Sequence, residues 1–234
     1  TEKCKTPVFH AVSTFDILNE MFIRSKFHFG TADERELAGK MIDAVAQDVY
    51  YKDEPQIWIF DRGFPSLSLI QKLLEHRLYF VMRVSSSFLK EVNAFRKSKY
   101  VDRVIHIEYS ERRATQNHVH SDGISQFDLR CVRVKLPSGE DEILVTNLDR
   151  KDFPKRDIKE IYRLRWGIET GFNYLKNAVF VEEFVSKTEN GLAQDYFVSL
   201  LVYNFATCIC GSMYPNIPKK ENTSTRSIEE LPPD

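Results

Sequence analysis

The sequence predicts an α/β protein built on a mixed β-sheet with flanking helices, and three patterns support this fold class. Two short apolar segments flank an amphipathic helix between residues 56 and 84, and a strand–helix–strand unit of this kind places its two strands in parallel. One β-hairpin is predicted before this unit and another after it. The chain has 234 residues, of which 42% are hydrophobic, so it can bury one sizeable core with an inserted subdomain.

The first hairpin and the helix after it follow from local sequence. Residues 8–15 and 21–27 have the composition of strands and are joined around Asn19. Thr31 and Glu34 form a capping box, which predicts the start of a helix. The apolar face of this helix consists of residues at helical spacing: Leu37, Ala38, Met41, Ile42, Val45 and Ala46.

The strand–helix–strand unit ends its first strand at a carboxylate. Residues 56–60 are rich in β-branched and aromatic side chains, and Asp61 follows them directly. Pro65 starts the next helix, and residues 78–84 form the second strand. Ligands commonly bind at the carboxyl edge of such a sheet, so Asp61 is a candidate binding residue. The alternative is that Asp61 only caps the turn into the next helix.

The second half of the chain changes in character. Residues 85–147 are polar, and we expect a β-rich insertion there, with a strand at 104–109 and a hairpin formed by 127–136 and 142–147. The predicted divisions are residues 1–84 for the first part of the core domain, 85–147 for the insertion, 148–213 for the second part and 214–234 for a disordered tail.

One helix is predicted to carry four polar residues along one edge. It begins after Pro154, and at about 100° per residue Tyr162, Arg165, Glu169 and Lys176 fall near 0°, 300°, 340° and 320°. This edge flanks a buried face and would line a cleft. The pair Arg165 and Glu169 is also explained by a simple helix salt bridge, but that leaves the other two residues unexplained. The apolar face consists of Ile161, Ile168, Phe172 and Leu175.

A second helix is predicted at residues 192–213. It is apolar nearly all round, so we expect it to be buried.

Composition excludes several classes of protein. The net charge of −1 argues against coating of nucleic acid by charge alone, although residues 150–165 contain seven Lys or Arg against three acids. The four cysteines lack metal-ligand spacing, and nothing nearby completes a site with His118 and His120. The glycines form neither a P-loop nor a dinucleotide-binding motif. No signal peptide or membrane span is evident, so we expect a cytoplasmic protein with reduced thiols.

The spacing of the four polar residues resembles a known signature. Tyr162–x2–Arg165–x3–Glu169–x6–Lys176 is similar to the pattern of bacterial insertion-sequence transposases of the insertion sequence four family. These enzymes belong to the DDE superfamily, whose catalytic domain is ribonuclease H-like. Residues 57–64 (IWIFDRGF) resemble the segment that carries the family's second catalytic aspartate.

The resemblance implies phosphoryl transfer on DNA. Asp61 and Glu169 would be catalytic ligands of two Mg²⁺ (or Mn²⁺) ions. Arg165 and Lys176 would contact phosphates of the transposon end, and Tyr162 would donate a hydrogen bond to one. The implied partners are double-stranded DNA at terminal inverted repeats, target DNA and a second copy of the chain in the active complex, but no membrane.

One departure from the family concerns its third carboxylate. The family's sheet order is 3-2-1-4-5, and counting back from Asp61 places the first, central strand and its aspartate before Thr1. Asp16 is the other candidate, in the hairpin connection. We therefore expect an amino-terminally truncated fragment that is inactive alone. The alternatives are a remnant that binds DNA without cutting it and a nuclease of the same fold.

Overall fold

The computed structural model shows two compact units, and each is described by itself. The hairpin unit comprises the described residues up to Met41 and from Trp166 onward, and the sheet unit comprises the described residues of 42–165. The structure describes residues 9–30, 32–108, 110, 112, 126–136, 139–178, 186 and 188–213. The predicted cap Thr31, the histidines His118 and His120 and the tail 214–234 lie outside these residues.

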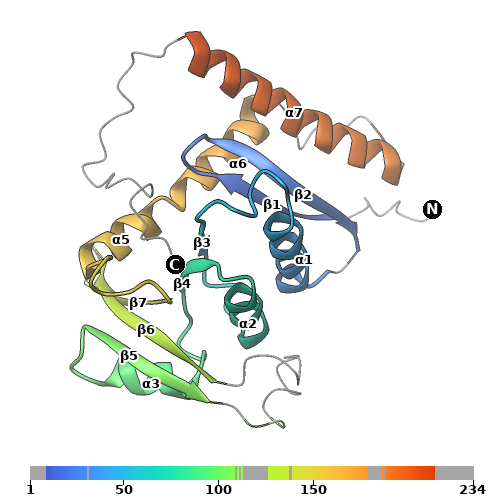
Figure 1. Cartoon of the computed structure of the whole chain (residues 1–234). Helices are drawn as coiled ribbons and strands as arrows, with labels where there is room; N and C mark the ends of the chain where they lie inside the picture. The colour runs from blue at the N-terminus through green and yellow to red at the C-terminus, as the bar shows by residue number, and fades with distance from the viewer. Residues whose placement is uncertain are drawn as a thin grey trace. The chain divides into compact units, whose positions relative to one another are not determined.

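The sheet unit contains a five-stranded mixed sheet of order β3-β4-β7-β6-β5 (Figure 1). β3 and β4 run parallel, as the strand–helix–strand pattern predicted, and all other neighbours are antiparallel. The described residues thus confirm an α/β fold with a mixed sheet. The strands are β3 (Ile57–Phe60), β4 (Tyr79–Arg83), β5 (Asp102–Glu108), β6 (Gln126–Lys135) and β7 (Asp141–Thr146).

The strands of the predicted insertion continue this sheet. β7 pairs with β4, with Arg83 opposite Leu144, and β6 and β5 extend the ladder from β7. The two units divide after residues 41 and 165. That residues 85–147 are an insertion into a catalytic domain stays a prediction.

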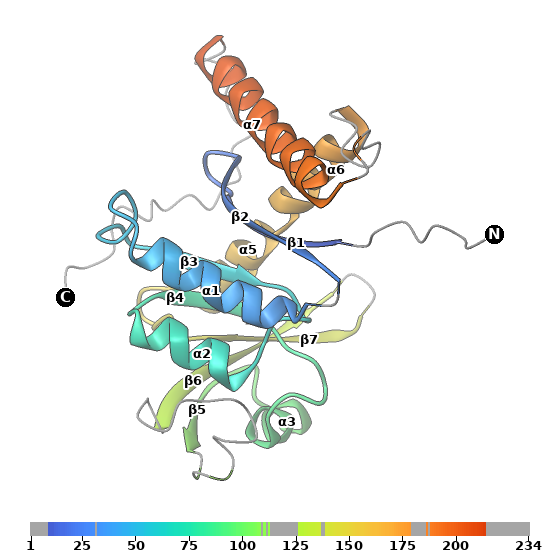
Figure 2. The same cartoon turned by 90° about the vertical axis from the view of Figure 1, so that its right-hand side faces the viewer.

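Helices cover both faces of the sheet unit. α2 and α5 lie on opposite sides of the strands (Figure 2). α2 is capped by Ser66, whose hydroxyl accepts a hydrogen bond from the Leu69 amide at 3.2 Å. α5 inserts the fully buried Ile158 into a core that contains Val81 and Leu144. The helices are α2 (Leu67–Glu75), α3 (Lys90–Lys97) and α5 (Lys155–Arg163).

The hairpin unit packs a two-stranded antiparallel sheet against helices. Asp16 closes the hairpin turn, because its carboxylate accepts hydrogen bonds from the backbone amides of Leu18 and Asn19. The Asn204 amide of α7 bonds both backbone groups of Phe22 in β2, at 2.9 and 2.8 Å. The elements are β1 (Phe9–Asp16), β2 (Met21–Phe29), the first part of α1 (Glu34–Ala46), α6 (Trp166–Ala178) and α7 (Glu189–Met213). The core consists of Phe22, Leu175, Tyr196, Leu200 and Tyr203.

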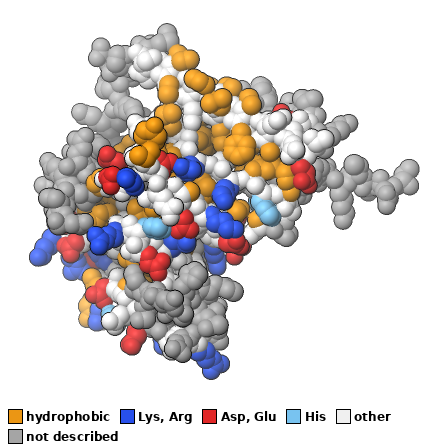
Figure 3. All heavy atoms as spheres, turned by 45° about the vertical axis from the view of Figure 1, so that its right-hand side comes forward, with side chains coloured by type: hydrophobic (Ala, Val, Ile, Leu, Met, Phe, Trp, Pro, Cys, Tyr) orange, Lys and Arg blue, Asp and Glu red, His pale blue; other side chains and the backbone are white. Residues whose placement is uncertain are grey.

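The prediction that the last helix is buried all round was wrong. α7 buries one face, and its other side exposes large apolar side chains (Figure 3). Apolar composition alone does not determine how many sides of a helix are covered, and in the hairpin unit the buried residues lie along one side. The exposed residues are Phe197, Val198, Leu201, Val202, Phe205 and Ile209. Across the described ranges, we find no helix with the length and apolarity needed to cross a bilayer.

The predicted long helix is also divided. α5 ends at Arg163 and α6 begins at Trp166. Between them the chain tightens into a turn, in which the Arg165 amide donates to the Tyr162 carbonyl, three residues back, at 3.2 Å. The two helices bury their apolar residues in different cores, since Ile158 packs in the sheet unit and Leu175 in the hairpin unit. One uninterrupted helix with a single apolar face is therefore not what forms.

Gly171→Ala is expected to lower the free energy of unfolding by roughly 1 kcal/mol. A Cβ at Gly171 would lie 3.1 Å from the Phe15 ring, and this ring is fixed by edge contact with Phe22. The overpacking cost of ~1–3 kcal/mol should exceed the gain of ~1 kcal/mol from the higher helix propensity of alanine. Urea denaturation measures the change. Gly211→Ala is the control, because nothing lies within 4 Å of its Cβ position, and a loss of stability there would contradict the steric explanation.

Candidate active site

Asp61 lies at the carboxyl end of β3, where the predicted binding edge would be. The chain turns sharply after it, with the Phe64 amide donating to the Asp61 carbonyl at 3.1 Å. Its side chain accepts a hydrogen bond from the amide of Arg62, but the cap of the following helix is Ser66. Capping of α2 therefore does not explain this carboxylate. The Asp61 side chain is 44% exposed, so a ligand can reach it.

Three side chains of the sheet unit converge on this carboxylate. The Tyr162 hydroxyl donates a hydrogen bond to Asp61 Oδ1 at 3.2 Å. Arg165 Nη1 lies 3.8 Å from Oδ2, and Arg83 Nη1 lies 3.9 Å from Oδ1. Asp61, Tyr162 and Arg165 are thus brought together although about a hundred residues separate the aspartate from the other two. The cluster places one carboxylate among two guanidinium groups and a phenol.

Arg83 and Glu142 belong to the cluster but were missed in the sequence. Arg83 Nε bonds Glu142 Oε1 at 2.8 Å, and the Glu142 side chain is only 11% exposed. The register of the parallel strands could have indicated Arg83, because Phe60 pairs with Met82 and the next position beside Asp61 is Arg83. No sequence pattern indicated Glu142, since its place follows from the antiparallel pairing of β7 with β4.

The phenol of Tyr162 is a hydrogen-bond donor at neutral pH. Burial, together with the negative charge of Asp61, raises its pKa to about 12, while the charges of Arg165 and Arg83 oppose this shift. The guanidinium carbon of Arg165 lies 5.8 Å from the centre of the Tyr162 ring. Tyr162 therefore keeps its proton and can donate a hydrogen bond to an oxygen of Asp61 or of a ligand.

Glu169 and Lys176 lie in the hairpin unit. Both are on α6, seven residues or about two turns apart, so they share one side of that helix. Glu169 is partly buried and Lys176 is exposed. Because they belong to the other unit, their placement beside Asp61 stays a prediction.

Asp61 has the chemistry expected of a ligand for a hard divalent cation. It offers carboxylate oxygens at an exposed edge, and such oxygens are the donors that Mg²⁺ prefers. In the described part of the chain, no group of three or more His, Cys, Asp or Glu side chains could hold a metal ion. Asp61 is therefore not part of a group of three or more such side chains among the described residues.

Comparison with known proteins identifies the family. The model of the transposase DDE domain matches residues 1–205, most of the chain. The chain belongs to the DDE transposase family. By family it is a transposase domain of the insertion-sequence type, and enzymes of this family act on DNA with divalent metal ions.

Three relatives of this DDE transposase are themselves named as transposases. A Sinorhizobium fredii protein, transposase y4zB, is 26% identical over 62% of this chain and 40% of its own length. The transposase of insertion sequence element IS4SA from Synechocystis is 22% identical over 75% of this chain and 46% of its own. That of element IS5377 from Geobacillus stearothermophilus is 22% identical over 74% and 43%. The chain thus spans less than half the length of the curated relatives that it matches.

Proposed function

We propose that this chain supplies the catalytic core of a transposase that cleaves and joins DNA strands at transposon ends. The observation that carries the proposal is the convergence of Tyr162 and Arg165 on Asp61. A carboxylate that can bind a metal then stands beside a hydroxyl donor and a guanidinium, the groups that recognise a phosphate.

The proposed roles follow from the chemistry of each side chain. Asp61 and Glu169 hold Mg²⁺ or Mn²⁺, which when bound activates the attacking oxygen and stabilises the leaving one. Tyr162 donates a hydrogen bond to a phosphate oxygen, because its phenol is protonated at neutral pH. Arg165 and Lys176 bind phosphates of the DNA backbone.

A DNA phosphate can offer Arg165 a shorter contact than Asp61 does. Arg165 Nη1 lies 3.8 Å from Asp61 Oδ2, beyond hydrogen-bond distance, and the carboxylate is partly exposed. A phosphate oxygen within hydrogen-bond distance would form a charge-assisted bond with the same guanidinium. Arg83 differs, because Glu142 already bonds it at 2.8 Å.

We further propose that a strand with a third carboxylate pairs with β3. Within the described sheet β3 is an edge strand, hydrogen-bonded to β4 alone, and its outer backbone groups are able to accept another strand. On this proposal the 234-residue chain does not cleave DNA by itself. The partners would be terminal inverted repeats, target DNA and, in a cytoplasmic active complex, a second copy of the chain.

Arg165→Met is expected to weaken binding to duplex DNA by roughly 10- to 100-fold. Loss of one charged hydrogen bond to a phosphate costs about 1.5–3 kcal/mol, and it should also reduce the slope of log K against log salt by about 1. Fluorescence anisotropy at several salt concentrations measures both quantities. The matched control is Arg163→Met, because Arg163 is exposed and pairs with Glu160.

Equal losses for the two arginine variants would contradict the role of Arg165. Cleavage is tested separately, with the third carboxylate supplied on an added strand. Mg²⁺-dependent cleavage confined to terminal repeats supports a transposase, and cleavage of any duplex indicates a general nuclease. Salt-dependent binding without cleavage indicates a remnant that only binds DNA.

A further inference from the structure

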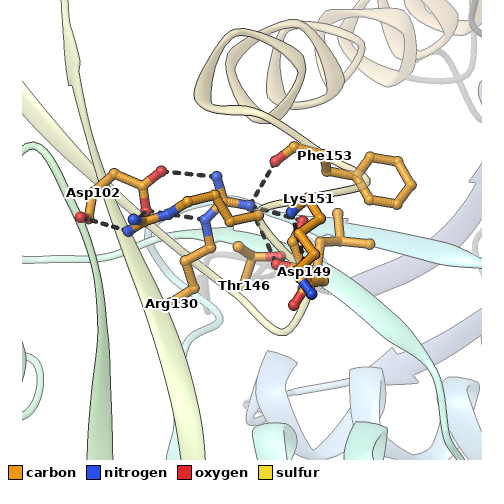
Figure 4. Close-up of polar contacts among 8 residues, drawn as sticks. Asp102, Arg130, Thr146, Asp149, Lys151 and Phe153 are labelled. Carbon is orange, nitrogen blue, oxygen red and sulfur yellow. Dashed lines mark hydrogen bonds and ion pairs between the residues drawn. The ribbon is translucent and has the colours of Figure 1, made fainter.

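A buried arginine outside the cluster at Asp61 joins two strands of the sheet. Arg130 lies on β6 and is 3% exposed. Its guanidinium donates two hydrogen bonds to Asp102 of β5, from Nε to Oδ1 at 3.0 Å and from Nη2 to Oδ2 at 2.9 Å (Figure 4). Arg150 also bonds Asp102, at 3.0 Å. Asp102 therefore balances the charge of Arg130, and the Nη1 group of Arg130 bonds other parts of the fold.

The remaining nitrogen of Arg130 holds the segment that connects β7 to α5. Nη1 donates to the backbone carbonyls of Leu148 at 3.2 Å, Asp149 at 3.2 Å and Phe153 at 2.6 Å. The same segment is fixed from within, since the Thr146 hydroxyl accepts from the Leu148 amide at 3.1 Å. One side chain thus fixes both ends of the connection, as Figure 4 shows.

This connection determines where α5 begins. The cap residue Pro154 makes no side-chain cap hydrogen bond, and the carbonyl held most closely by Arg130 belongs to Phe153, one residue before the cap. From there a nine-residue helix leads to Tyr162. A helix rises about 1.5 Å per residue and is stiff over two turns, so a displacement at Phe153 is carried to Tyr162.

We propose that Arg130 is a positioning residue: it fixes the start of α5 and so holds Tyr162 and Arg165 at Asp61. Its meaning for catalysis rests on the proposed function, whereas its effect on the Tyr162–Asp61 contact does not. A guanidinium can form two hydrogen bonds with a carboxylate and still donate to the three carbonyls. Lysine cannot replace it, because its donors all belong to a single ammonium group.

The test places a fluorinated tyrosine at position 162 and compares its ¹⁹F chemical shift with that of the same residue in a short peptide, both at one slightly acidic pH at which the phenol is protonated. With Arg130 present, the chemical shift should differ from the peptide value, because the Tyr162 ring is partly buried beside Asp61 and Arg165. Arg130→Lys should move the chemical shift toward the peptide value. It should also weaken DNA binding as much as Arg165→Met does.

Arg133 provides the matched control. It lies on the same strand and bonds Asp141 and the carbonyls of Phe95, Arg96 and Ser98, so it secures the end of α3 and not the start of α5. Arg133→Lys should leave the ¹⁹F chemical shift at position 162 unchanged. If both lysine variants shift it equally, or if Arg130→Lys folds and shifts nothing, the proposal is overturned.

A second variant covers the case in which Arg130→Lys does not fold. Asp102→Asn keeps the shape of the ion pair and removes its charge, so it should produce a smaller shift in the same direction, and no shift would count against the proposal. If the chain binds no DNA at all, the proposed function fails. The comparison of ¹⁹F chemical shifts still decides on Arg130 in that case.

Discussion

Asp61→Asn is expected to lower the rate of Mg²⁺-dependent strand cleavage by roughly 10³-fold or more, in a complex that contains this chain and the third carboxylate. Asparagine keeps the size and one oxygen of aspartate but loses the negative charge that holds the metal. Metal stabilisation of the transition state amounts to several kcal/mol, and each ~1.4 kcal/mol is a factor of ten in rate. Single-turnover cleavage of a transposon-end duplex measures the effect.

Binding of DNA by the Asp61→Asn chain should be retained, since no phosphate contact is removed. Asp43→Asn is the matched control, because Asp43 is similarly exposed in the sheet unit but pairs with Lys72 of α2 and with His76, which caps the end of α2. Glu169→Gln should reproduce the loss of cleavage if its carboxylate shares the metal site. Wild-type rates for either Asp61→Asn or Glu169→Gln would remove that residue from the site.

Asp102→Ala is expected to lower the free energy of unfolding by about 3–5 kcal/mol. The change leaves the Arg130 guanidinium, 3% exposed, without its carboxylate, and an uncompensated buried charge is costly. Urea denaturation at neutral pH measures the loss. The control is Asp128→Ala, which removes an exposed ion pair with His106 and should cost about 1 kcal/mol or less.

Acid should reduce the difference between wild type and Asp102→Ala. Burial alone would raise the pKa of Asp102, but the hydrogen bonds and charges of Arg130 and Arg150 outweigh it and hold the pKa below its usual value. A lowered folded-state pKa gives a contribution that is complete above the unfolded-state pKa of about 4 and lost as the pH falls through the folded-state value. A gap in stability that stays constant as the pH is lowered from 7 to 2 would contradict this linkage.

Local sequence patterns predicted the elements but not how they are assembled. The parallel pair β3 and β4 and the two hairpins were predicted within a few residues, because their strands are neighbours in the chain. The pairing of β7 with β4, and with it Glu142, joins residues about 60 positions apart and leaves no periodic trace. The covering of α7 could not be predicted either, because hydrophobicity shows which residues avoid water and not which surface receives them.

The site was predicted to a similar extent. The sequence singled out Asp61, Tyr162 and Arg165, and the structure brings these three side chains together, whereas their roles toward metal and phosphate stay predictions. Helical periodicity, however, treated Tyr162 through Lys176 as one element. It could not detect that the residues on either side of Leu164 pack into different cores.

The joint at Leu164 and Arg165 has a consequence for how the spacing of the signature is maintained. Each half of the motif is anchored by a hydrophobic cluster of its own, so neither cluster constrains the number of residues between them. An insertion or deletion at this joint would spare both clusters and still move the proposed metal ligand Glu169 relative to the arginine before it. Selection for activity, and not for folding, would then keep the interval of three residues unchanged.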